Sequence, residues 1–174
     1  MKHLLLVIAT LALASTSHAE VVDAQSNGFQ VKRTAVLNAP ADKVYAALAQ
    51  PSQWWSKDHT WSGSAANLSL APMSGGCFCE KLPTGGVQHM IVTHIEVPRT
   101  LVMQGALGPM ATLGVSGAMG WTLDEHAGRT QLQVTYNIGG YMPGGLAPLA
   151  PAVDGVLAGQ VKRLKRYVET GRPE

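Results

Sequence analysis

Charged residues are scarce in this chain, whichever sign is considered. The 174 residues include 13 lysine and arginine and 11 aspartate and glutamate side chains, which gives a formal net charge of +2 at pH 7. A nucleic-acid-binding surface needs a clear excess of basic residues, so nucleic acid is not an expected partner. Many glycine, alanine, leucine and valine residues are present, and no internal repeat or linker divides the chain. This composition indicates a single domain with an extensive apolar interior.

Motifs that carry well-known catalytic or cofactor chemistry are missing. The sequence has no GxxxxGK[ST] phosphate-binding loop, no HExxH zinc motif, no Ser-His-Asp constellation and no pair of catalytic carboxylates. Neither a cofactor nor a metal ion is therefore expected.

Long apolar runs are also rare, and the only one lies at the N-terminus. Lys2 precedes an apolar stretch over residues 4–14, and small residues then occupy the −3 and −1 positions of a cleavage site at Ala19. This pattern is typical of a secretory signal peptide, and the run is shorter than the ~20 residues of a membrane span. We expect a signal peptide over residues 1–19 and one periplasmic or secreted domain over residues 20–174, with a retained N-terminal anchor as the alternative.

The chain has two cysteines, which stand two residues apart at Cys77 and Cys79. In a strand both would lie on one face, with their Cα atoms roughly 6.5–7 Å apart, at the upper limit for a disulfide. Three states remain open. The residues are buried or free thiols, or a strained disulfide favoured by an oxidising compartment, or part of a metal site whose other ligands are not evident.

Hydrophobic periodicity predicts a strand, two short helices, a run of strands and one long helix. An alternating strand is expected over residues 29–37, followed by a helix that begins near residue 41 and a second that begins at Pro51. Six more strands are expected over residues 63–70, 76–82, 89–96, 100–104, 117–123 and 130–138.

The long helix is expected to begin near Pro151 and to bury one face against the sheet. Gly155 and Gly159 share a side of this helix and each costs about 1 kcal/mol relative to alanine, so they indicate either close packing on the sheet or space left for a ligand. The apolar residues fall at helical spacings of three and four, namely at Val153, Leu157, Val161, Leu164 and Val168.

Six short segments in this order resemble the SRPBCC superfamily, the START-like or Bet v 1-like helix-grip proteins. The closest likeness is to bacterial members of the polyketide cyclase/dehydrase type and to homologues of the Hsp90-ATPase activator. The resemblance covers residues 28–170 and rests on residues 31–44, 54–55, 75–80, 95–101, 128–132 and 152–164.

This resemblance implies an α+β helix-grip fold, in which a seven-stranded antiparallel sheet curves around the C-terminal helix and encloses a hydrophobic pocket. Members of the superfamily include lipid carriers, hormone receptors and cyclases, so the fold does not define the chemistry. Hsp90 is not expected as a partner, because that chaperone is cytosolic and this chain carries an export signal.

Aromatic and flexible apolar side chains are the candidates for the wall of such a pocket. Tryptophan is also ordinary core material, so at least two of the four tryptophans are expected to serve only in packing. Two glycine-rich loops, residues 105–114 and 139–145, either gate the pocket or cap the core. The candidate ligand-binding residues are Trp54, Trp55, Phe78, Trp121, Tyr136, Tyr141 and Leu157, with Met110 and Met142 at the mouth.

Few residues offer acid–base chemistry inside the pocket. His89 and His94 are an odd number of residues apart in one predicted strand, so only one of them faces inward if that strand is regular. Glu80 shares its side of a strand with Phe78, which leaves an inward place open, whereas surface exposure is the expectation for a lone glutamate. His59 follows the tryptophan pair and lies near one end of the expected pocket. The candidate polar residues are His94, His59 and Glu80.

Three functions fit this sequence. The first is an exported protein that holds a hydrophobic small molecule or lipid between sheet and helix. The second is an enzyme of the cyclase or dehydratase type that uses the same pocket, which an inward ionisable group with a partner would favour. The third is an interaction module that docks a partner protein through its apolar loops.

Overall fold

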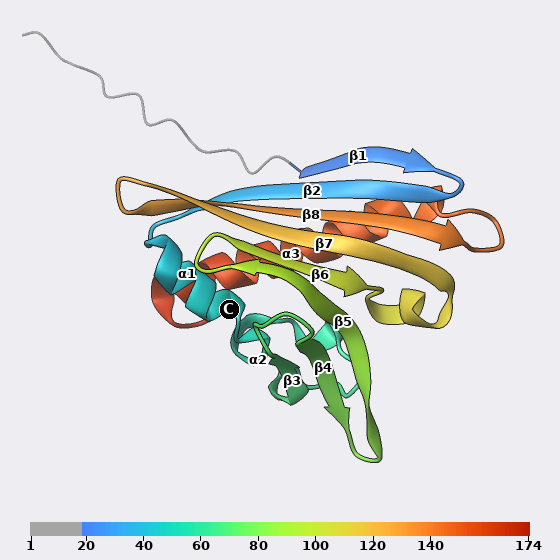
Figure 1. Cartoon of the computed structure of the whole chain (residues 1–174), viewed down its shortest axis with the longest axis horizontal. Coiled ribbons are helices and arrows are strands. Elements are labelled where there is room, and N and C mark those ends of the chain that lie inside the picture. The colour runs from blue at the N-terminus through green and yellow to red at the C-terminus, as the bar shows by residue number, and fades with distance from the viewer. Residues whose placement is uncertain (1–18) are drawn as a thin grey trace, which may run out of the picture.

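Residues 19–174 form one antiparallel sheet with three α-helices, and the computed structural model describes only this range (Figure 1). The expected signal peptide therefore lies, except for its last residue, outside the described residues. The strands are β1 (Ala19–Gln25), β2 (Gly28–Leu37), β3 (Leu68–Leu70), β4 (Cys77–Leu82), β5 (Gly85–Glu96), β6 (Thr100–Gly105), β7 (Gly114–His126) and β8 (Arg129–Tyr141). The α-helices are α1 (Ala41–Leu48), α2 (Pro51–Trp54) and α3 (Ala150–Thr170), with short 3-10 turns η1 (Lys57–His59), η2 (Ala65–Asn67), η3 (Gly108–Thr112) and η4 (Ala147–Leu149).

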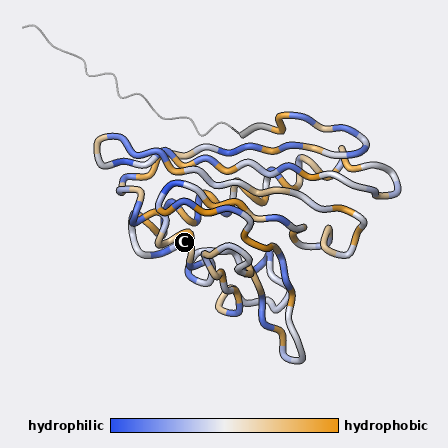
Figure 2. Tube along the Cα trace, viewed as in Figure 1, coloured by the Kyte–Doolittle hydropathy of each residue, from blue (hydrophilic) through white to orange (hydrophobic). Residues whose placement is uncertain are grey.

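The sheet is ordered β1-β2-β8-β7-β6-β5-β4-β3, and neighbouring strands are antiparallel throughout. The interior strand β8 pairs without a register shift with both β2 and β7. Apolar and polar residues alternate along these strands (Figure 2), because successive side chains point to opposite faces. The inward set of β8 is completely or almost completely buried and comprises Leu132, Val134, Tyr136 and Ile138.

The helix-grip architecture is confirmed, with eight strands where seven were predicted. The additional strand, β1, lies at the sheet edge and pairs with β2. It begins at the expected cleavage site, and its sequence AEVVDAQ lacks a clear apolar alternation. The predicted strand over residues 63–70 is also shorter than expected, since residues 65–67 form η2 and only Leu68–Leu70 pairs with β4.

Helix α3 lies across one face of the sheet (Figure 1). Buried aliphatic side chains at the predicted spacing hold it against the sheet, namely Leu157, Val161, Leu164 and Val168. Its N-terminal half is joined to β2 by an ion pair, in which Arg33 Nε donates to Asp154 Oδ1 at 2.6 Å. Among residues 19–174, no helix is both long and apolar enough to cross a membrane.

The two glycines of α3 neither pack closely on the sheet nor line the cavity described below. A Cβ atom built on Gly155 or Gly159 meets no atom within 4 Å, so neither glycine is needed for close packing. Both are exposed, and neither lines the large cavity described below. They lie on the solvent side of the helix.

Cys77 and Cys79 form a disulfide, which resolves the three states left open by the sequence. Their Cα atoms are 5.4 Å apart, closer than the spacing expected of a regular strand and within the usual disulfide range. The ladder between β4 and β5 shifts register between Phe78 and Cys79. The pairing between β4 and β5 is therefore irregular next to the disulfide.

Candidate functional site

A cavity of about 300 Å³ lies between the sheet, the N-terminal half of α3 and the η3 turn. Its volume is at the lower end of the range of small-molecule sites. Six of the predicted ligand-binding residues line it: Trp55, Phe78, Met110, Tyr136, Met142 and Leu157. The expected pocket is therefore present, and its wall is largely apolar.

Trp54 and Trp121, also predicted to bind the ligand, lie deeper in the core. They are 2% and 1% exposed, and their ring centroids are 6.4 Å apart in an edge-to-face arrangement. They line a separate void of about 10 Å³, which is about the space of one water molecule. These two tryptophans are the core material that the sequence led us to expect among the four.

Tyr141 does not line the cavity, although its neighbour Met142 does. Its side chain is 75% exposed at the end of β8. Side chains alternate between the two faces of a strand. Tyr136 and Ile138 face inward, so Tyr141, three residues beyond Ile138, faces the other side.

The apolar loop over residues 105–114 closes one side of the cavity. Leu107, Met110 and Leu113 all turn their side chains toward it. The loop is fixed by Tyr136, whose Oη accepts a hydrogen bond from Leu107 N at 3.2 Å and donates to Gly105 O at 3.3 Å. Burial raises the pKa of Tyr136, so this hydroxyl stays neutral and is occupied by the backbone.

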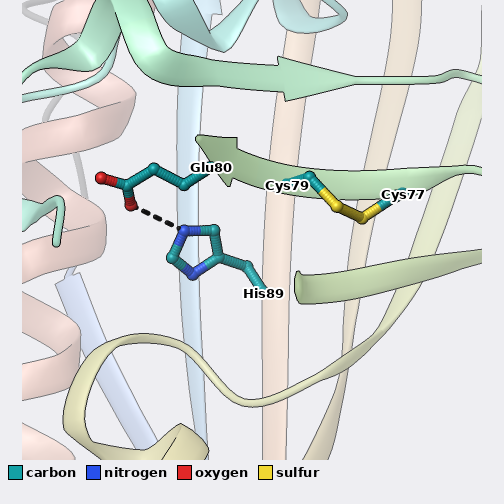
Figure 3. Close-up of a disulfide and its surroundings, with 4 residues drawn as sticks. All are labelled: Cys77, Cys79, Glu80 and His89. Atoms are coloured by element: carbon teal, nitrogen blue, oxygen red, sulfur yellow. Dashed lines mark hydrogen bonds and ion pairs between the residues drawn. A yellow bond between two sulfur atoms is a disulfide. The ribbon is translucent and has the colours of Figure 1, made fainter. Parts of the chain in front are cut away.

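The polar part of the site is a buried pair, Glu80 and His89 (Figure 3). Glu80 Oε2 lies 3.0 Å from His89 Nε2, and the two residues are 2% and 5% exposed. The inward place of Glu80 agrees with its parity with Phe78. The ordinary expectation of an exposed glutamate is wrong at this position.

His89 points inward because β5 is irregular. Phe78 pairs with Met90 and Cys79 pairs with Gln88, which leaves His89 as an additional residue in β5. Such a bulge redirects a side chain, and consequently His89 and Met90 are both buried although they are consecutive. Sequence reasoning placed His89 only as the alternative to His94 and did not include it among the candidates.

The other candidate histidines lie at the surface. The side chain of His94 is 54% exposed, and its Nε2 lies 3.3 Å from Glu96 Oε1. His59 is exposed in η1 at the edge of the cavity, which it partly lines. His94 therefore contributes nothing to the cavity, and the inward histidine of β5 is His89.

The surroundings of Glu80 stabilise its ionised form. Burial by itself raises the pKa of this carboxyl. The hydrogen bonds that it accepts from Ser62, Trp61 and His89 outweigh burial and lower that pKa below its ordinary value of 4.5. The backbone donors are Trp61 N at 3.1 Å and Ser62 N at 2.5 Å.

An ionised Glu80 determines which nitrogen of His89 carries the proton. A carboxylate only accepts hydrogen bonds, so His89 Nε2 must be the donor. In the neutral imidazole, Nδ1 is then an unprotonated acceptor. This nitrogen is buried and has no hydrogen-bond partner among the described residues, and it lies on the side of the ring turned away from Glu80 (Figure 3).

A series of aromatic contacts connects the packed core to this pair. Trp54 contacts Trp55 with ring centroids 5.4 Å apart, Trp55 contacts Phe78 at 5.5 Å, and Phe78 contacts His89 at 5.1 Å. The rings hold His89 from one side while Glu80 holds its Nε2. In the part of the chain that the structure describes, no three histidine, cysteine, aspartate or glutamate side chains are grouped as a metal site.

Comparison with known proteins agrees with this geometry. The family of polyketide cyclase / dehydrase and lipid transport proteins matches residues 28–169. The chain belongs to this family. The resemblance to SRPBCC proteins is thereby confirmed, and no curated protein matches the sequence.

Solved structures share the fold at low sequence identity. A conserved protein of unknown function from Enterococcus faecalis is 15% identical, with a TM-score of 0.58 over 89% of this chain and 78% of that one. CalU16 from Micromonospora echinospora is 13% identical, with a TM-score of 0.58 over 92% and 88%. The Aha1 dimer from Colwellia psychrerythraea is 18% identical, with a TM-score of 0.57 over 82% and 97%. At this level of identity the likeness extends to the fold alone.

Proposed function

We propose that this chain is an exported protein that binds a small hydrophobic molecule in the cavity beneath α3. The observation that carries the proposal is the cavity of about 300 Å³ with its largely apolar wall. Burying apolar ligand surface against such a wall contributes about 25 cal/mol per Å², whereas burying an unpaired charge there is costly. The volume favours a compact ligand over a long acyl chain.

Two observations support export. The N-terminal pattern is typical of a secretory signal peptide, and Cys77 and Cys79 are joined in a disulfide. Disulfides persist in the periplasm and outside the cell and are rare in the cytosol. The residues proposed to contact the ligand are the six predicted ones that line the cavity.

Native mass spectrometry of the protein purified from its own compartment tests this function. A bound small molecule should appear as a discrete mass difference that is lost on denaturation. The variant Val156→Phe, which adds bulk to the cavity wall, should lower the bound fraction at least several-fold. Lys162→Phe, on the exposed side of the same helix, is the matched control and should retain it. Equal ligand loading in both variants would place the ligand elsewhere and overturn the proposal.

A second candidate function, catalysis of the cyclase or dehydratase type, is favoured by one observation. His89 is an inward ionisable group with a carboxylate partner, which is how a general base is held and oriented. A bound compound that the wild-type protein converts and the His89→Gln variant only binds would establish this function. A compound released unchanged after incubation with the wild type would identify a carrier.

The third hypothesis, docking of a partner protein through the apolar loops, has no specific observation in its favour. Leu107 and Leu113, the residues that would make the contact, line the cavity.

A further inference from the structure

Two polar side chains of the cavity wall, Tyr136 and Trp55, are occupied by hydrogen bonds within the protein, and a third, His59, lies at the exposed edge. Tyr136 Oη is bonded to the backbone of Gly105 and Leu107. Trp55 Nε1 donates to His59 O at 3.1 Å. His89 Nδ1 differs from these atoms, because it is buried and lacks a hydrogen-bond partner among the described residues. A buried polar atom without a partner costs free energy. A ligand group that forms a hydrogen bond with this nitrogen would remove that cost.

The chemistry of that missing group follows from the hydrogen bond on the other side of the ring. Glu80 holds the proton on Nε2, and in the neutral ring Nδ1 therefore presents a lone pair. A lone pair is matched by an O–H or N–H donor. A carbonyl, ether or carboxylate oxygen only accepts hydrogen bonds, so its lone pairs would repel that of Nδ1.

We propose that His89 Nδ1 is the recognition point for a hydroxyl group on an otherwise apolar ligand, such as a phenol, an enol or an alcohol. Glu80 acts as the positioning residue that selects the accepting form of the ring. This inference rests on the proposed function, since it assumes that the ligand occupies the cavity. It adds the polar feature by which one hydrophobic molecule is selected over another.

Two probes of nearly equal shape separate the inference from the proposed function. 2-Naphthol carries a hydroxyl group where 2-methylnaphthalene carries a methyl group. Titrated into the wild-type protein, 2-naphthol should bind about tenfold more tightly, the factor expected of one net hydrogen bond. Val156→Phe should weaken both probes. Equal affinities in the wild type would overturn the hydroxyl site and leave the cavity intact. If Val156→Phe changes the affinity for neither probe, the probes do not occupy the cavity, and the proposed function itself fails.

The variant His89→Phe removes the acceptor and keeps an aromatic ring of similar size. It should bind 2-methylnaphthalene about as tightly as the wild type and lose the preference for 2-naphthol. Glu80 would be left with two backbone donors in this variant, so His89→Phe combined with Glu80→Gln serves as a second form that avoids an unpaired buried charge. Retention of the tenfold preference in either variant would show that another atom recognises the hydroxyl.

The role of Glu80 is tested by the tautomer of His89. In Glu80→Gln, the amide oxygen can accept from Ser62 N, the closer backbone donor, while the amide nitrogen takes the place of Oε2 and donates to His89 Nε2, which transfers the imidazole proton to Nδ1. Long-range ¹H–¹⁵N NMR should show the Nε2–H form in the wild type and the Nδ1–H form in the variant. In the same variant, the ratio of the affinity for 2-naphthol to that for 2-methylnaphthalene should fall at least several-fold. A purely structural glutamate would leave the tautomer unchanged, and that result would overturn the positioning role.

Discussion

The space between the helices and the sheet is filled very differently at its two ends. Under α1 and α2, Trp54 and Trp121 pack edge to face and leave a void of about 10 Å³. Under the N-terminal half of α3, the cavity measures about 300 Å³. We call these regions the packed end and the open end. Large aromatic side chains provide the stability of the first, which allows the second to remain hollow.

The open end is held by polar contacts where packing is absent. The Arg33–Asp154 ion pair joins α3 to β2, and Tyr136 fixes the loop that carries η3. Directed contacts of this kind maintain a shape without filling it. If this comparison is correct, substitutions at the packed end should lower stability, whereas those at the open end should mainly alter binding.

The largest effect is expected at the packed end. Trp121→Ala removes a side chain that is 1% exposed and should lower the free energy of unfolding by about 4 kcal/mol, through lost burial and the cavity left behind. Leu113→Ala at the open end should cost less than about 1 kcal/mol, because its side chain faces a cavity that already exists. Urea denaturation measures both. Equal costs would contradict the distinction between the two ends.

The next effect concerns the ion pair over the open end. Asp154→Ala should lower the free energy of unfolding by about 3 kcal/mol, because Arg33 is left buried without its counter-charge. Asp124→Ala, an exposed aspartate in β7, is the control and should change stability by no more than about 0.5 kcal/mol. The same denaturation experiment reports both variants. A negligible loss in Asp154→Ala would show that packing alone holds this half of α3.

A smaller effect is expected for Glu80. Its replacement by glutamine should cost about 2 kcal/mol at neutral pH, the scale of a buried hydrogen bond to a charged group. Because the pKa of Glu80 is lower in the folded chain than its ordinary value of 4.5, its contribution to stability is complete above that value and is lost as the pH falls through the folded pKa. The difference between wild type and Glu80→Gln should therefore shrink as the pH drops below 4.5 and through the folded pKa. A difference that grows toward acid pH would contradict the assigned charge state.

The smallest effects are expected for the two glycines on the solvent side of α3. Gly155→Ala and Gly159→Ala should each raise the free energy of unfolding by about 1 kcal/mol, since a Cβ at either position meets no atom within 4 Å. Neither should change the affinity for 2-naphthol, because these glycines do not line the cavity. Thermal denaturation and titration measure the two properties separately. A loss of probe binding in either variant would mean that the open end extends around the helix.

The sequence allowed much of this fold to be predicted, because the relevant patterns are local. The alternation in β8 and the helical spacing of Leu157, Val161 and Leu164 follow from burial on one face. The parity of Glu80 with Phe78 left an inward place open, but exposure was the expectation for a lone glutamate, and that expectation was wrong. The edge strand β1 was missed because its pattern is weak and an edge strand buries little.

The key residue of the candidate site could not be predicted, and the reason is structural. Parity along a regular strand places only one of His89 and His94 inward, without saying which. The choice depends on two register shifts in β5, one that leaves His89 as an additional residue opposite β4 and one between Val92 and His94 opposite β6. A bulge reverses the parity of the residues beyond it, and no local pattern in the sequence marks its position.

A crystal structure of the wild-type protein with 2-naphthol would test the central claim most directly. The account predicts density for the naphthyl ring in the open end, between Leu157 and Phe78, with the hydroxyl oxygen within hydrogen-bond distance of His89 Nδ1. Density at the protein surface with the cavity left empty would contradict it.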